Sequence, residues 1–182
     1  TGGAGFIGSN FIQYWIKHYP NDKIIVLDSL NYASNISSIR NLIDNLKINF
    51  IKGNISNYNL ILNSLRKFNI THVINFAAET HVDRSINNPE IFINSNILGT
   101  YNLLKCFKEY WNENNKPPNW RFLQISTDEV FGSLGSNDNK FTELSPYQPR
   151  SPYSASKASG DHLVEAWHST FELPTLITNC SN

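Results

Sequence analysis

The chain has 182 residues, 40% of them hydrophobic, and its 15 basic and 15 acidic side chains cancel to a formal net charge of zero. This length is enough for one globular domain with a buried core. The balanced charge gives no electrostatic basis for binding nucleic acid or a membrane surface, and no apolar run reaches the roughly 20 residues of a membrane span. Cys106 and Cys180 lack metal-ligand spacing, so we expect no metal site and a reducing, cytoplasmic setting.

Short apolar runs alternate with segments of helical periodicity along the whole chain. Such alternation indicates a Rossmann-like doubly wound α/β fold, in which helices cover both faces of a parallel sheet. No repeat or linker divides the sequence, so we expect one domain over residues 1–182. In chain order, the predicted elements are a glycine loop at 2–8, a helix from Phe6, a strand at 23–28, a helix at 36–46, a strand at 48–52, a helix at 60–68, a strand at 72–78, a helix at 89–111, a strand at 121–126, a polar loop at 132–150, a helix at 152–171 and a strand after Pro174.

Both ends of the sequence have the features expected of a fragment. The sequence contains no methionine, and Thr1 opens directly on the glycine loop with no strand before it. The segment from Thr175 has the pattern of a strand that continues into a loop. We therefore expect a domain truncated at both ends, without its first strand.

The glycine loop and the acid that follows it indicate a dinucleotide site. Gly2, Gly5 and Gly8 allow close backbone approach to a pyrophosphate, which the N–H groups and dipole of the next helix would favour. Asp28 ends the next predicted strand, twenty positions after Gly8, where a carboxylate can bind a ribose diol and repel a 2′-phosphate. The pattern favours NAD over NADP. The alternatives are a simple tight turn and a turn-capping role for Asp28.

Tyr153 and Lys157 stand four residues apart, on one face of the helix predicted from Pro152. A nearby ammonium lowers the pKa of a phenol by favouring its charged form, so we expect Tyr153 to act as a base near neutral pH. The alternative is a solvated helix face, since Tyr-x-x-x-Lys spacings are common by chance. The preceding dinucleotide loop favours the catalytic interpretation.

Three further candidate catalytic residues follow a buried strand. Thr127, Asp128 and Glu129 come at its carboxyl end, where ligands of parallel sheets bind. The Thr127 hydroxyl can donate a hydrogen bond to an alkoxide or carbonyl. The adjacent carboxylates can meet different environments, so that one serves as acid and the other as base. A solvated acidic loop is the alternative.

The motifs TGGAGFIGSN, AAETHVDRS, NILGTYNLL, STDEVFG, YSASKASGDH and TNCSN, which together span the chain, resemble the dTDP-glucose 4,6-dehydratase family of extended short-chain dehydrogenases/reductases. The resemblance implies bound NAD, a dTDP-glucose substrate, a substrate lobe largely absent from this chain, and a homodimer formed by the helices after Pro89 and Pro152. It implies substrate contacts from Thr80, Thr127 and Asn182. The implied cofactor contacts are Phe6, Ile7, Asp28, Ser29, Leu30, Asn31, Asn54, Ile55, Phe76, Ala77, Ala78, Glu79, Thr80, Ser95, Tyr153 and Lys157, in addition to the loop glycines.

The chemistry implied by the resemblance has three stages. Tyr153 takes the proton of the sugar 4-hydroxyl while NAD accepts hydride from C4. Glu129 then removes the C5 proton, and Asp128 protonates the departing 6-hydroxyl, which releases water. Hydride returns to C6, giving dTDP-4-dehydro-6-deoxy-glucose and regenerated NAD.

Two other functions remain open. A related nucleotide-sugar 4-epimerase would share the glycine loop, Asp28, Tyr153 and Lys157, but would not need the Asp128–Glu129 pair. An NAD-sensing regulator would keep the fold and should tolerate loss of the Tyr153 hydroxyl. Asn54 departs from the family pattern, which usually has Asp there, but it keeps an acceptor oxygen.

Overall fold

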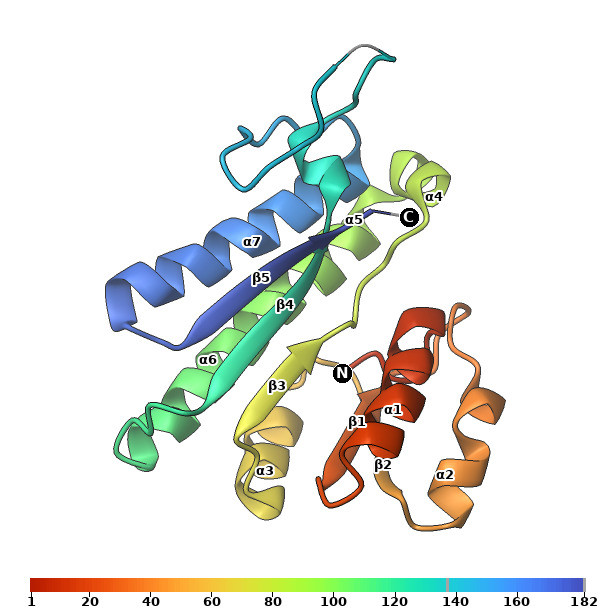
Figure 1. Ribbon diagram of the computed structural model, residues 1–182, viewed down its shortest axis with the longest axis vertical. Helices are drawn as coiled ribbons and strands as arrows, with labels where there is room; N and C mark the ends of the chain where they lie inside the picture. Colours follow the sequence, from red (N-terminus) through yellow and green to blue (C-terminus); the bar gives the residue numbers. More distant parts are fainter. Residues whose placement is uncertain (137, 182) are drawn as a thin grey trace.

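The computed structural model of the chain describes residues 1–136 and 138–181. Helices and strands alternate as expected, and the α/β class with parallel sheets is confirmed (Figure 1). The elements are α1 (Phe6–His18), β1 (Ile24–Asp28), the 3₁₀ turn η1 (Ile36–Ser38), α2 (Arg40–Asp44), β2 (Ile48–Lys52), α3 (Tyr58–Phe68), β3 (His72–Asn75), α4 (Val82–Asn87), α5 (Pro89–Phe92), the π-helix η2 (Ile93–Gly99), α6 (Thr100–Glu113), β4 (Arg121–Thr127), the 3₁₀ turn η3 (Asp128–Phe131), α7 (Pro152–Phe171) and β5 (Thr175–Cys180).

The strands form two parallel sheets, β1–β2 and β3–β4–β5, where the sequence predicts one. The N-terminal residues lie between them (Figure 1). Thr1 donates to the carbonyl of Ile74 at 2.8 Å and accepts from the N–H of Phe76 at 3.2 Å, while Gly2 donates to the carbonyl of Leu27 at 2.9 Å. Two residues supply too few hydrogen bonds for a ladder, so the sheets are joined without a continuous strand.

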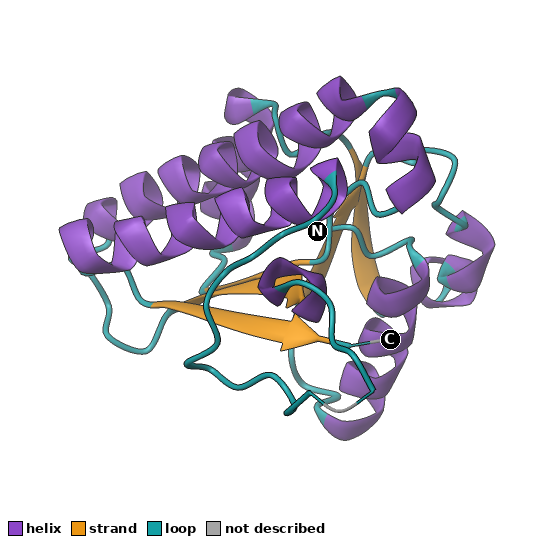
Figure 2. Cartoon of the chain, turned by 90° about the horizontal axis from the view of Figure 1, so that it is seen from above, coloured by secondary structure: helices purple, strands orange, loops and turns teal. Residues whose placement is uncertain are grey.

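Each sheet has its own apolar core. Ile12, Val26 and Ile48 are buried between α1, β1 and β2. The larger core lies around β3 and β4, with Phe107 of α6 and Phe122 of β4 fully buried. Seen from above, α6 and α7 run side by side along the β3–β4–β5 sheet (Figure 2). This packing fixes the start of α7 relative to the carboxyl ends of the strands.

Four predicted segments differ from the structure. The helix expected at 89–111 is α5, η2 and α6, with a π-helical stretch that is typical of functional sites. The helix expected at 36–46 is split into η1 and α2, because Ile39 between them has φ −122°. The strand expected at 72–78 ends at Asn75, since the backbone beyond it leaves the ladder and lines a cavity. The short helix α4 is not predicted.

Candidate active site

A cavity of about 780 Å³ lies at the carboxyl ends of the strands and receives residues from both sheets. This is the edge at which open parallel sheets bind ligands. Every member of the predicted cofactor set lines it except Leu30. These lining residues are Gly2, Gly5, Phe6, Ile7, Gly8, Asp28, Ser29, Asn31, Asn54, Ile55, Phe76, Ala77, Ala78, Glu79, Thr80, Ser95, Tyr153 and Lys157.

The glycine loop is packed too tightly for side chains. Gly2 has φ 66°, and a Cβ there would lie 2.5 Å from the backbone nitrogen of Ala77. A Cβ on Gly8 would lie 2.4 Å from the carbonyl oxygen of Gly2. Within the described residues, no acceptor is found for the N–H groups of Phe6, Ile7 and Gly8, which begin α1 and line the cavity. These donors suit an anion.

Asp28 can serve both roles considered from the sequence, a turn cap and a contact for a ligand hydroxyl. Its carboxylate accepts from the N–H of Ala4 at 2.9 Å, the N–H of Leu30 at 2.8 Å and the hydroxyl of Ser34 at 2.7 Å. It therefore braces the glycine loop, as the structural alternative proposed. A carboxylate has about four lone-pair sites, so one remains on the cavity side for a ligand hydroxyl.

Leu30 is the one predicted cofactor contact that the structure places elsewhere. Its backbone turns into the left-handed region at φ 57°, and its side chain packs against the β1–β2 core. Only the family resemblance implied a cofactor contact for this residue. The turn that Asp28 stabilises directs it away from the cavity.

The carboxyl end of β4 separates the two acidic candidates. Thr127 and Glu129 line the cavity, whereas Asp128 does not. The Thr127 hydroxyl accepts from the N–H of Glu129 at 3.3 Å and donates to Asp128 at 3.4 Å, which fixes the turn. Burial, with the Asp128 charge adding to it, raises the pKa of Glu129. A carboxylate with a raised pKa is a better base near neutral pH.

Tyr153 and Lys157 both reach the cavity from α7, but their electrostatics differ from expectation. Burial raises the pKa of Tyr153 to about 12, with the Glu129 charge adding and a Thr127 hydrogen bond opposing. Burial lowers the pKa of Lys157 to about 8. The expected lowering of the Tyr153 pKa is wrong for this structure, because burial raises that pKa and no contribution from Lys157 offsets it. The Lys157 ammonium donates to the carbonyl of Ile125 at 2.6 Å.

Asn96, which the sequence analysis missed, joins three parts of the site. Its amide nitrogen donates to the carbonyl of Glu79 at 2.8 Å and to the hydroxyl of Ser156 at 2.9 Å, and its oxygen accepts from the N–H of Glu79 at 2.8 Å. Ser156 in turn donates to the carbonyl of Tyr153 at 2.7 Å. The π-helix thus ties the loop after β3 to the start of α7. Helical periodicity alone gives no signal for such a buried amide.

Other cavity residues were also not predicted. Several of them lie in the last residues of a strand or directly after it, a position that would have been a usable signal. They are Leu27, Ala33, Ser34, Gly53, Ser56, Ile91, Asn94, Ile125, Ser126 and Cys180. The predicted substrate contact Asn182 lies outside the described residues, whereas Thr80 and Thr127 line the cavity.

Across residues 1–136 and 138–181, no group of three or more His, Cys, Asp or Glu side chains is placed to hold a metal ion. Over the same residues, no helix has both the length and the apolar character needed to cross a bilayer.

The sequence model of the GDP-mannose 4,6 dehydratase family matches residues 1–182. The chain belongs to this family. It is 49% identical to the dTDP-glucose 4,6-dehydratase of Haemophilus influenzae over 184 aligned residues, which cover 100% of the chain and 54% of that protein. The resemblance stated from the motifs is confirmed.

Solved structures agree with the family. The dTDP-glucose 4,6-dehydratase of Bacillus anthracis in complex with NAD is 41% identical, with a TM-score of 0.86 over 100% of this chain and 53% of that one. The UDP-glucose 4-epimerase of Thermus thermophilus, in complex with NAD, is 25% identical, with a TM-score of 0.83 over 98% of this chain and 52% of that one. The chain spans about half the length of the relatives it matches.

Proposed function

We propose that the chain is the NAD-binding part of a dTDP-glucose 4,6-dehydratase. The observation that carries this is a single cavity that runs from the glycine loop to Thr127, Glu129, Tyr153 and Lys157. A dinucleotide and the reacting end of a sugar would therefore meet at the catalytic candidates. The relatives from Haemophilus influenzae and Bacillus anthracis are dTDP-glucose 4,6-dehydratases, so this nucleotide sugar is the first substrate to test.

The residues at the glycine-loop end of the cavity fit the pyrophosphate and one ribose of NAD. The N–H groups of Phe6 and Ile7 face the place of a pyrophosphate, and Asp28 keeps one acceptor position for a ribose hydroxyl. The carboxylate would repel a 2′-phosphate, which supports NAD over NADP. Bound NAD supplies a hydride acceptor that later returns the hydride.

The side chains of this chain would perform the proton transfers. Tyr153 takes the proton of the 4-hydroxyl, and the raised pKa of its phenol makes a bound cation necessary for this step near neutral pH. Lys157, which lines the same cavity, would bring positive charge to it when protonated, and so would the nicotinamide of bound NAD. Glu129 removes the C5 proton from inside the cavity. Asp128 lies outside the cavity lining, so its role as acid requires the 6-hydroxyl to reach past Thr127.

A homodimer is a further part of the proposal. Ile93, Leu98 and Tyr101 are large apolar side chains exposed along η2 and α6, with exposed fractions of 47%, 51% and 40%. These elements follow Pro89, where the sequence analysis expects the dimer helices. Light scattering of the complete protein at micromolar concentration should give twice the monomer mass, and a monomer would contradict the dimer.

A reducing, cytoplasmic setting agrees with two unpaired cysteines, Cys106 and Cys180.

Proton NMR of dTDP-glucose with the complete protein in deuterated water tests the reaction. A new C6 methyl signal with deuterium at C5 is expected, and Tyr153→Phe should remove nearly all turnover. Inversion at C4 without a methyl signal would show a 4-epimerase, which is the activity in the name of the Thermus thermophilus structure. An unchanged sugar would exclude dTDP-glucose and lead to GDP-mannose and other nucleotide sugars. If the Tyr153→Phe variant keeps the full biological function of the protein, the chain would belong to an NAD-sensing regulator and not to an enzyme.

A further inference from the structure

Asp161 is a buried carboxylate that the proposed mechanism does not use. It lies on α7, two helical turns after Tyr153, and its exposed fraction is 0%. One carboxylate oxygen accepts from the hydroxyl of Ser126 at 2.6 Å and from the hydroxyl of Tyr147 at 3.3 Å. The other oxygen has no hydrogen-bond partner among the described residues. Burying a carboxylate with one oxygen unpaired costs folding free energy, so we look for interactions that offset this cost.

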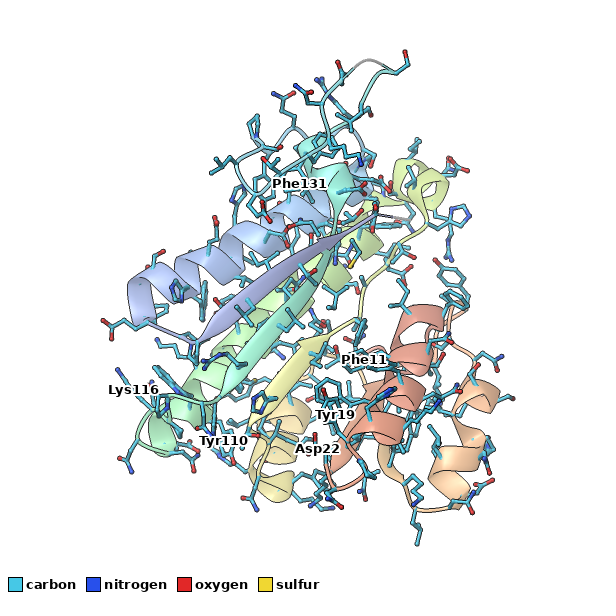
Figure 3. The ribbon with its side chains drawn as sticks, viewed as in Figure 1. Phe11, Tyr19, Asp22, Tyr110, Lys116 and Phe131 are labelled. Carbon is cyan, nitrogen blue, oxygen red and sulfur yellow. The ribbon has the colours of Figure 1, made fainter. Side chains whose placement is uncertain are left out.

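The first compensating interaction is a set of contacts that holds neighbouring elements together. Ser126 immediately precedes Thr127 at the carboxyl end of β4, and Tyr147 belongs to the loop that leads into α7. The Tyr147 ring also packs against Phe131, with centroids 5.3 Å apart, and against His162, with centroids 4.6 Å apart. Phe131 lies at the end of the sheet opposite Tyr110 (Figure 3). Asp161 thus connects the catalytic strand end, the loop and α7.

The second interaction is electrostatic. Lys157 lies one helical turn before Asp161, its exposed fraction is 5%, and its ammonium donates to the carbonyl of Ile125. Asp161 on the same helix and Cys180 on β5 are the titratable groups whose charge favours the ammonium. Burial raises the pKa of Asp161, and four groups oppose that shift by favouring the ionised form: Ser126, Lys157, Tyr147 and Asn179.

We propose that Asp161 is a positioning residue of the candidate active site, which anchors the carboxyl end of β4 through Ser126 and keeps the ammonium of Lys157 charged. The consequence for catalysis rests on the proposed function. Lys157 lines the same cavity as Tyr153 and brings positive charge to it only while it is protonated, and burial alone favours the neutral amine. Asp161 opposes that effect without touching cofactor or substrate.

The direct test follows the Lys157 Cε resonance by NMR in the complete protein labelled with ¹³Cε-lysine, with the signal assigned by Lys157→Arg. In Asp161→Asn, which keeps shape and removes charge, the titration midpoint of Lys157 should fall by ~1 pH unit or more. The alkaline limb of kcat against pH should move to lower pH by a similar amount, and kcat near neutrality should fall about twofold while KM changes little.

Two matched variants separate charge from anchoring. Ser126→Ala removes the hydrogen bond but leaves the carboxylate, so kcat should fall while the Lys157 midpoint stays in place. Glu165→Gln removes an exposed carboxylate one turn further along α7 and should change neither quantity. An unchanged Lys157 midpoint in folded Asp161→Asn would overturn the inference. If the midpoint falls but the wild-type protein never dehydrates dTDP-glucose, only the proposed function fails.

Discussion

At the scale of single residues, the site depends on backbone shape as much as on chemistry. Gly2 takes a left-handed φ of 66° and lies against the backbone of Phe76 and Ala77. Gly5 has φ −74°, and a Cβ there would lie 3.3 Å from the carbonyl of Gly2. The two glycines share one motif but carry different constraints.

Replacing Gly2 by Ala should therefore destabilise the protein more than replacing Gly5. We expect Gly2→Ala to lower the free energy of unfolding by at least about 2 kcal/mol, because backbone strain and a clash with backbone act together. Gly5→Ala should change it by less than about 1 kcal/mol. Urea unfolding of both variants measures the difference, and equal losses would contradict this account.

The burial that places Lys157 in the candidate active site lowers the stability of the fold while its amine is charged. Its folded pKa of about 8 lies below the ordinary 10.5, so the unfolded chain binds this proton more tightly and stability rises as pH increases from 8 to 10.5. At pH 7, Lys157→Met should raise the free energy of unfolding by up to about 3 kcal/mol. The gain should vanish near pH 10.5. Unfolding curves at pH 7 and 10 test this, and a pH-independent difference between variant and wild type would refute it.

At the scale of elements, α7 places two catalytic candidates in its first two turns. Its N-terminus has a capping box, in which the Ser151 hydroxyl accepts from the N–H of Ser154 at 3.0 Å and the Ser154 hydroxyl accepts from the N–H of Ser151 at 3.0 Å. Pro152 occupies the first helical position, where its missing N–H is harmless. The cap therefore fixes the backbone that carries Tyr153.

Removing this cap should lower both stability and activity. Ser151→Ala should lower the free energy of unfolding by about 1 kcal/mol. It should also reduce kcat, because the first turn of α7 frays. Ser159→Ala, a change at a half-buried position in the middle of the same helix, serves as control and should be neutral or slightly stabilising. Thermal unfolding and steady-state kinetics give both readouts, and equal behaviour of the two variants would argue against the cap.

At the scale of the whole molecule, the cavity lies where the two sheets meet. The β1–β2 side contributes Asp28 and Asn54, and the β3–β4–β5 side contributes Thr127 and Tyr153. Thr1 and Gly2 join the sheets through few hydrogen bonds. A dinucleotide that fills the cavity would therefore link two units that are weakly joined by backbone alone.

Hydrogen exchange measures this linkage. Saturating NAD at about 100 times its dissociation constant should stabilise the fold by about 2.7 kcal/mol. Protection should increase in β1–β2 and in β3–β4–β5 together. NADP should protect less, because Asp28 repels its 2′-phosphate. Protection confined to one sheet, or equal protection by NADP, would count against the proposed cofactor site.

The sequence by itself determined the α/β class, the order of most elements and most of the predicted part of the cavity lining, while ten lining residues were missed. These features follow from local patterns: apolar periodicity, glycines at fixed offsets and polar residues at strand ends. Family motifs supplied contacts such as Asn54 and Ser95 that periodicity does not reveal. The roles of the individual catalytic residues stay predictions.

Only the tertiary structure decided which polar groups are buried together. It directs Leu30 away from the cavity, separates Asp128 from Glu129, and brings Asn96 of the π-helix against Glu79 and Ser156. It also raises the pKa of Tyr153, where the Tyr-x-x-x-Lys spacing predicts a lowered value. The physical reason is that burial and long-range hydrogen bonds depend on elements distant in the chain, and no local pattern encodes them.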